Sequence, residues 1–294
     1  GYYKFFNDKN IFLFDSPKVR MSLTFNDDLL LGNFLSRILP LLFAVLIYSF
    51  SRTKYIYSLF FIIFISTDVL IYITGERTAF ILLTLSAIFI VCLMKNFKIL
   101  RLFSIVVSSI IIIIITLNSP ELKDRNITST FNQITSKVES TTSEDNQQTN
   151  VIFSIHHHRL IMTSYNMFLD NPLFGQGPKL FRKYCSKSDF MYDENSCSTH
   201  PHNSYAQMLA EIGLFGTLFY LIIIIYFIFL ISRHLYQKYF MKVDFISDYN
   251  VALISCFFIS LWPFAPTLNL FNNWINILYF LPVGFYLHSI NNKN

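Results

Sequence analysis

Long apolar runs separated by short polar connections dominate the chain. A run of about 20 apolar residues can cross the ~30 Å hydrocarbon core of a bilayer as a helix that rises 1.5 Å per residue. Counting such runs predicts about seven membrane spans. They cover roughly residues 34–50, 55–74, 78–94, 99–117, 212–232, 250–268 and 272–289. The pattern therefore predicts an all-α fold, a polytopic transmembrane helical bundle.

Two places in this pattern are irregular. Arg37 and Pro40 lie near the start of the first predicted span, and Trp262, Pro263 and Pro266 interrupt the region of the last two. Proline inside a span kinks the helix and frees a carbonyl group. The ends of the sixth and seventh spans are therefore not fixed by the pattern.

One long polar segment, residues 119–211, divides the chain into an amino-terminal part (1–118), this segment, and carboxy-terminal spans (212–294). Its first part, Ile127–Asn150, is rich in Thr, Ser, Asn and Gln, which is typical of a linker or a frayed helix. An amphipathic helical pattern follows, with apolar residues at Ile152, Ile155, Leu160, Met162, Met167 and Phe168. A turn-rich stretch, "NPLFGQGPKLF", comes next, and a last helix opens near His202 and continues into the fifth span.

Lysine and arginine near the span ends predict the orientation. The connections 51–54, 95–101 and 233–249 carry these residues and alternate correctly to share one side, which we assign to the cytoplasm. The segment 119–211 then faces the other side. Cys185 and Cys197 lie in it, and in an oxidising compartment they either pair, closing a short loop, or remain free thiols.

Composition supports a membrane protein: 53% of residues are hydrophobic and only 14% are charged, with a mean hydropathy of +0.45. A soluble domain would not expose so much apolar surface. The chain begins with Gly1 rather than Met and has no visible signal peptide, so we expect a carboxy-terminal piece with further spans upstream.

Several polar groups lie at the outer mouths of the spans. Glu76 and Arg77 sit between two apolar runs; they face a cavity or partner, or form a simple interfacial turn. Arg159 follows three histidines and shares a helix face with His156, either as a binding group or as part of a basic face on lipid headgroups. His156 and His157 do not share a face, and no His-Glu-x-x-His pattern is present, which argues against zinc.

The stretch "HPHN" precedes the last helix. Asn203 is a candidate helix cap, whereas His202 is either part of that capping turn or a general base, because an imidazole titrates near neutral pH. Glu211 lies half a turn around from His202 and is expected to be a structural partner, for example for an arginine. Asp27, Asp28 and Arg37 either belong to a loop before the first span or form a wall of the same cavity.

Outward-facing arginines and a histidine at membrane depth suit a lipid-linked phosphate or pyrophosphate, because a guanidinium binds phosphate oxygens in bidentate fashion. No Gly-rich nucleotide loop is present. An outer site has no ATP or nucleotide sugar to use, so the energy must arrive with the substrate, as a polyprenyl pyrophosphate leaving group would supply it.

Five stretches resemble motifs of the O-antigen ligase/polymerase superfamily (the Wzy_C type), in the right order and nearly along the whole chain. They are "HPHNSYAQMLAEIGLFG", "TGERTAFILL", "HHHRLIMTSYNMFLDNPLFGQGPKLF", "FNDDLLLGNFLSRILPL" and "FNNWINILYFLPVG". The resemblance implies a GT-C-like glycosyltransferase of the bacterial inner membrane, with its active site and large helical loop facing the periplasm. Its donor would be a glycan on undecaprenyl pyrophosphate.

The resemblance also implies roles for single residues. Arg77 and Arg159 would bind the pyrophosphate, and His202 would deprotonate the acceptor hydroxyl for an inverting attack, with no metal or other cofactor. Possible supporting residues are Arg37, Glu76, His200, Asn203 and Glu211. The acceptor would be lipid A-core, another lipid-linked repeat unit or a protein hydroxyl.

Two alternatives from other classes remain. A transporter that binds an anion at the outer face predicts charges inside several spans, whereas Asp68 is the one clear acid deep in a span. A structural membrane scaffold gives no reason for clustered polar residues at the outer mouths. Membrane lipids are expected partners, and nothing in the pattern indicates nucleic acid.

Overall fold

The computed structural model describes residues 30–50, 55–135 and 154–291, and these residues form helices joined by turns and irregular segments, with no strand among them. The described chain divides into two compact units. Unit 1 comprises residues 1–128, 228–262 and 278–294, and unit 2 comprises residues 129–227 and 263–277. The all-α helical membrane fold predicted from the apolar runs is confirmed.

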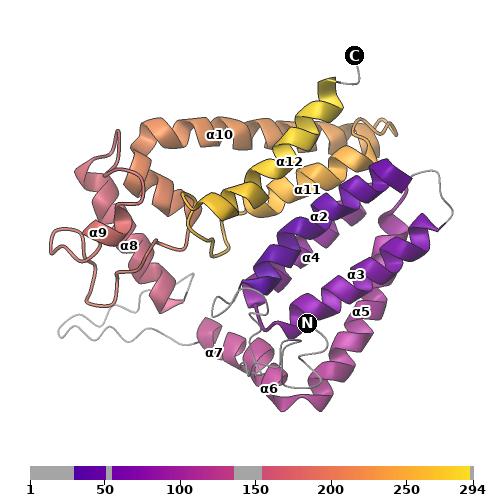
Figure 1. The fold of residues 1–294 in the computed structure, drawn as a ribbon, viewed down its shortest axis with the longest axis horizontal. Coiled ribbons are helices and arrows are strands. Elements are labelled where there is room, and N and C mark those ends of the chain that lie inside the picture. Colours follow the sequence, from indigo (N-terminus) through magenta and orange to yellow (C-terminus); the bar gives the residue numbers. More distant parts are fainter. Residues whose placement is uncertain (1–29, 51–54, 136–153, 292–294) are drawn as a thin grey trace. The chain divides into compact units, whose positions relative to one another are not determined.

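Each apolar run overlaps a helix, and five of the seven agree with their helix within three residues at each end; the exceptions are the runs 212–232 and 250–268 (Figure 1). The membrane-type helices are α2 (Leu31–Phe50), α3 (Ile56–Ile73), α4 (Arg77–Leu93), α5 (Lys98–Asn118), α10 (Ser204–Tyr239), α11 (Asp248–Ser260) and α12 (Asn273–Asn291). Of the described helices, α2, α3, α5 and α10 are long and apolar enough to cross a membrane, whereas α4 and α11 are apolar but shorter.

In unit 1, α11 packs against α2 and α4, and α3 packs against α5 (Figure 1). The rings of Phe43, Phe60 and Phe64 form an edge-to-face cluster with centroids 4.5–4.8 Å from that of Phe43. Because lipid tails are as apolar as these side chains, burial alone does not select one packing in a membrane. Hydrogen bonds between helices add that selection, such as Ser86 with Ser255 at 2.9 Å.

The sixth predicted span is wrong at its carboxyl end. Helix α11 ends at Ser260, and residues 261–272 are irregular instead of helical to residue 268. The physical reason is the pair Pro263 and Pro266: each lacks an N–H donor and disfavours the helical conformation of the residue before it.

Unit 2 contains α7 (Ser129–Thr135), α8 (Ile155–Asp170), α9 (Phe181–Tyr184) and the amino-terminal part of α10. In unit 1, α5 is followed by α6 (Pro120–Lys123) and a short π-helix, η2 (Asp124–Thr128), which the sequence pattern did not predict. The predicted linker Ile127–Asn150 is therefore helical to residue 135, and the rest of it lies outside the described residues.

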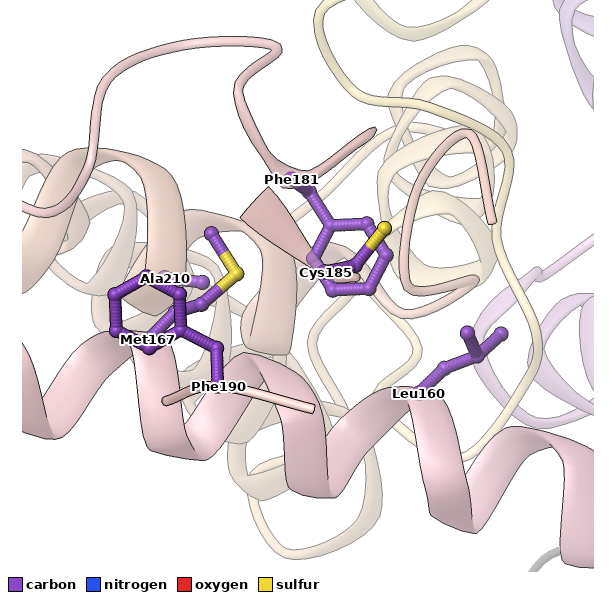
Figure 2. Packing of buried hydrophobic residues seen from close by; sticks show 6 residues of the cluster. All are labelled: Leu160, Met167, Phe181, Cys185, Phe190 and Ala210. Carbon is purple, nitrogen blue, oxygen red and sulfur yellow. The ribbon is translucent and has the colours of Figure 1, made fainter. Parts of the chain in front are cut away.

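The core of unit 2 lies between α8, α9 and the start of α10 (Figure 2). Helix α8 buries Leu160, Thr163, Ser164 and Met167, which follow the i, i+3, i+4, i+7 spacing of one helix face. Leu160 and Met167 were expected on that face, but the pattern did not show that the two hydroxyl residues complete it. The cluster consists of Leu160, Met167, Phe181, Cys185, Phe190 and Ala210.

Candidate active site

Helix α10 changes direction at Gly213, which has a φ of 62° and a ψ of −167°. The break removes normal helical partners from the backbone groups around it. The turn-rich stretch supplies new ones: Gln176 N–H donates to the carbonyl of Ala210 at 2.9 Å, and Leu214 N–H donates to the carbonyl of Pro172 at 2.8 Å. The turn and the kink are therefore two halves of one backbone junction.

Two glycines allow the junction to close. A Cβ on Gly213 would lie 2.5 Å from the backbone of Leu173, and a Cβ on Gly175 would lie 2.5 Å from the backbone of Glu211. Both glycines also have positive φ, which L-residues with a Cβ rarely adopt. This explains physically why "LFGQG" and "EIGLFG" carry glycine at these positions.

Glu211 fixes the same junction from inside. Its side chain is buried and accepts hydrogen bonds from the backbone N–H of Lys179 at 2.9 Å and of Phe181 at 2.8 Å. Gln207 donates to it at 3.1 Å. Glu211 is thus a structural partner, but its partners are backbone amides and an amide side chain rather than an arginine.

The turn before α10 is held by the irregular segment that follows α11. Thr267 N–H donates to the carbonyl of His202 at 2.8 Å, and the His200 ring contacts the carbonyl of Thr267 at 3.2 Å. Asn203 caps the helix, accepting from Tyr205 and Ala206 N–H at 3.0 Å each. Residues beyond Ser260, predicted to lie in a span, therefore hold the "HPHN" turn.

Four imidazoles gather at this turn. The ring of His202 lies 4.1 Å from that of His200, 6.0 Å from that of His156 and 5.9 Å from that of His157. The sequence predicts different helix faces for His156 and His157, because adjacent residues point apart on a helix. In the structure both rings lie near His202, which therefore sits over the amino-terminal end of α8.

His202 itself has a left-handed backbone, with a φ of 54°. A residue other than glycine in this region costs of order 1–3 kcal/mol, and such strain is found most often at functional sites. The hydrogen bond from Thr267 and the cap at Asn203 hold the turn in this conformation. The imidazole is thereby presented by a rigid turn rather than by a regular helix.

Three imidazoles of the cluster, those of His157, His200 and His202, favour the neutral form. Burial, followed by repulsion from His202 and His156, lowers the pKa of His157 to about 4. Burial, then His202 and Arg182, lowers the pKa of His200 to about 4, against the opposing effect of the hydrogen bond that its ring donates to the Thr267 carbonyl. Burial and His156 also lower the pKa of His202, with the Thr267 backbone opposing. A neutral imidazole is the form that accepts a proton.

Arg159 lies one helical turn after His156 on α8. Its Nε pairs with a carboxylate oxygen of Asp193 at 2.5 Å, and both side chains remain about one-third exposed. Asp193 belongs to the loop between Cys185 and Cys197, which the structure joins by a disulfide with Cα atoms 5.0 Å apart. Sequence reasoning missed Asp193; the one available signal was an acidic residue in a loop whose ends the cysteines tie.

The remaining candidates lie in unit 1. Glu76 is buried and accepts hydrogen bonds from Gly32 N–H at 2.6 Å and from the backbone and side chain of Asn33 at 3.0 and 2.7 Å, so it caps α2. Arg37 donates to the Asn33 side chain at 2.9 Å, and its guanidinium lies 5.7 Å from the Tyr279 ring centroid. Arg77 is the first residue of α4 and is partly exposed.

The sequence expectation for Glu76 is therefore refined, since its partner is the amino terminus of α2. Asp27 and Asp28 lie outside the described residues. Among the residues that the structure describes, no group of three or more His, Cys, Asp or Glu side chains is arranged to hold a metal ion.

A protein-family model described as O-antigen ligase matches residues 59–221, more than half of the chain. The matched region runs from α3 into α10 and includes Arg77, Arg159 and His202. No curated protein and no solved structure matches the chain.

Proposed function

Because the chain belongs to the O-antigen ligase family, we propose that it transfers a glycan from undecaprenyl pyrophosphate to an acceptor hydroxyl at the periplasmic face of the inner membrane. Ligase or polymerase activity of this general kind follows from the family. The donor, the face of the membrane and the residue roles below are the proposal. One observation carries it most: a rigid left-handed turn presents His202, whose buried imidazole favours the neutral form, beside three other histidine rings.

His202 is the general base. It takes the proton of the acceptor hydroxyl while that oxygen forms a bond to the anomeric carbon of the donor sugar. The bond from this carbon to the pyrophosphate oxygen breaks on the opposite face, so the configuration inverts. Undecaprenyl pyrophosphate leaves with the bonding electron pair, and the proton stays on the imidazole until solvent removes it.

Arg159 and Arg77 stabilise the charge that develops on the leaving group. Arg159 is supported by its place one turn from His156, whose ring approaches His202 in the same unit. Asp193 engages the Nε of Arg159, which orients the guanidinium and leaves its terminal amino groups as the phosphate-binding edge. Arg77 is assigned by its motif, and Glu76 beside it anchors that turn to α2.

The experiment uses the full-length protein in two hosts, one without its own ligase and one without its own polymerase. Surface glycan on a gel is the readout. Wild type is compared with His202→Ala, Arg159→Ala and a matched control, His158→Ala. His158 belongs to the same histidine run, but its ring packs against Tyr192 at 5.7 Å instead of against His202.

Rescue of lipid A-linked glycan identifies a ligase, and rescue of a repeat ladder identifies a polymerase. Both outcomes support the proposal if His202→Ala and Arg159→Ala abolish rescue while His158→Ala retains it. Glycan on protein instead would identify a protein acceptor. Retained transfer by His202→Ala, with the variant folded and present in the membrane, would overturn the assigned base.

A further inference from the structure

The turn that docks on the α10 kink exposes two large apolar side chains. Leu173 is 58% and Phe174 is 66% exposed, although the backbone around them is held by defined hydrogen bonds. No charged residue lies between Asp170 and Lys179. An ordered, uncharged turn with two outward apolar side chains is unusual for a surface that faces water only.

The same turn is tied to the beginning of a membrane-type helix. The carbonyls of Pro172 and Leu173 accept hydrogen bonds from Leu214 and Phe215 at 2.8 and 3.0 Å, and the Phe174 and Phe215 rings lie 6.0 Å apart. From Leu214 onward, α10 is strongly apolar. Only 6% of the residues in its 18-residue apolar window are buried within the described chain. The turn therefore lies at the level where the apolar stretch of α10 begins.

The backbone of the turn is compatible with lipid, where unpaired polar groups are strongly disfavoured. Gly175 N–H donates to the carbonyl of Asn171 at 2.9 Å, and the Asn171 side chain donates back to the carbonyl of Gly175 at 2.8 Å. Gln176 and Gly177 N–H are bonded to α10. These backbone groups are paired within the protein, so placing the turn at the headgroup boundary leaves fewer polar groups to be satisfied there.

We propose that Leu173 and Phe174 insert into the bilayer beside the start of the α10 apolar stretch, so that this turn is a lipid-binding wedge. Its partner is the boundary between headgroups and acyl chains of the leaflet in which that stretch begins. Aromatic and aliphatic side chains bind this region by removing apolar area from water. The wedge does not depend on the proposed glycan transfer.

The wedge would also set the depth of the histidine cluster. Ser204–Ile212, the part of α10 before the kink, spans about 13 Å at 1.5 Å per residue. Because Glu211 and the glycine junction join the turn to this part, the wedge and the histidine cluster lie at its opposite ends and keep a fixed separation. The wedge would therefore place a catalytic group on the His202 turn in the headgroup region, where the phosphate of a lipid-linked substrate lies.

The test places a fluorescent probe at single cysteines in the protein, with Cys92 and Cys256 replaced by serine and the Cys185–Cys197 disulfide kept. Phe174→Cys is compared with two references. The first is Phe219→Cys, at a side chain that is 61% exposed on the apolar stretch of α10. The second is Tyr192→Cys, at a side chain that is 47% exposed in the disulfide loop. The protein is reconstituted into phosphatidylcholine–phosphatidylglycerol vesicles with nitroxide-labelled acyl chains, and iodide is the aqueous quencher.

We expect the probe at position 174 to be quenched by the acyl-chain nitroxide several-fold more than the probe at 192, and by iodide several-fold less. If Phe174→Cys does not fold, Leu173→Cys tests the same prediction. Quenching like that at Tyr192 would show a water-facing turn and overturn the wedge. Protection from both quenchers would show that protein covers it, which overturns the proposal equally.

Discussion

The carboxylate of Asp68 on α3 accepts two hydrogen bonds from Arg101 on α5, at 2.7 and 2.9 Å. Both side chains are almost fully buried, and Ser108 donates to the same carboxylate at 3.0 Å. By its position in the sequence, Arg101 was assigned to the basic connection 95–101. In the structure the Arg101 side chain points into unit 1 and forms an ion pair with Asp68, the acid that lies deep in a span.

We expect Asp68→Asn to destabilise the protein by about 3–5 kcal/mol, because it leaves the Arg101 cation buried without its counter-ion. The double variant Asp68→Leu/Arg101→Met should recover most of that loss, since it removes both charges. Thermal unfolding of the detergent-purified protein measures this. The exposed pair of Lys95 and Asp244, 3.3 Å apart, is the control: Lys95→Gln should cost at most about 1 kcal/mol. If the thermal midpoint of Asp68→Asn equalled that of wild type, the ion pair would not stabilise the fold as proposed.

The helices could be predicted from sequence because the length and apolarity of a run are properties of one continuous segment. The second and third predicted spans, 55–74 and 78–94, differ from α3 and α4 by one residue at each end. The partner of Arg101 could not be predicted, because counting basic residues near span ends does not show where a long side chain points. The segment after Ser260 was missed for a related reason: its contacts are with residues about 60 positions away.

We expect Gly213→Ala to destabilise unit 2. The left-handed φ alone costs of order 1–3 kcal/mol for a residue with a Cβ, and the new atom would meet the Leu173 backbone at 2.5 Å. Thermal unfolding and protease cleavage in the 172–177 turn measure the effect. Gly284→Ala is the control, since a Cβ there meets nothing within 4 Å and should stabilise α12 by about 0.5–1 kcal/mol. Similar midpoints for the two variants would show that the junction tolerates a side chain.

The candidate site shows the same division between local and distant information. The glycines, the asparagine cap and the histidine run are visible as motifs because each reflects a local backbone requirement. The approach of His156 and His157 to His202, and the pairing of Arg159 with Asp193, join segments about 34–46 residues apart. No spacing rule links such residues in one sequence.

Removing the disulfide should loosen the loop that carries Asp193. Cys185→Ser/Cys197→Ser opens a bridge of sequence separation 12, which costs roughly 3 kcal/mol by the loss of the constraint on the unfolded chain. We expect a lower thermal midpoint and faster proteolysis between residues 185 and 197. Cys92→Ser, which removes a free thiol, is the control. Equal proteolysis of the double variant and wild type would show that the loop is held by other contacts.

Acid should weaken unit 2 through its histidines. The pKa values of His157 and His200 are about 4 in the folded chain and near 6.5 when unfolded, so the unfolded state binds more protons between these values. Stability therefore falls as the pH is lowered from about 6.5 towards 4 and changes little from this cause above 7. The charged or titratable groups that face these rings are His156, His202 and Arg182, and the polar groups are the Ser154 and Thr199 hydroxyls and the Thr267 carbonyl.

The thermal midpoint measured from pH 7.5 to pH 4.5 tests this prediction. Carboxylates also titrate in this window, so the informative quantity is the difference between variants. His200→Gln should reduce the fall in midpoint on acidification, because one neutral imidazole that resists protonation is gone, and His157→Gln/His200→Gln should reduce it further. An acid-induced fall as steep in the double variant as in wild type would mean that the buried imidazoles do not control the acid stability.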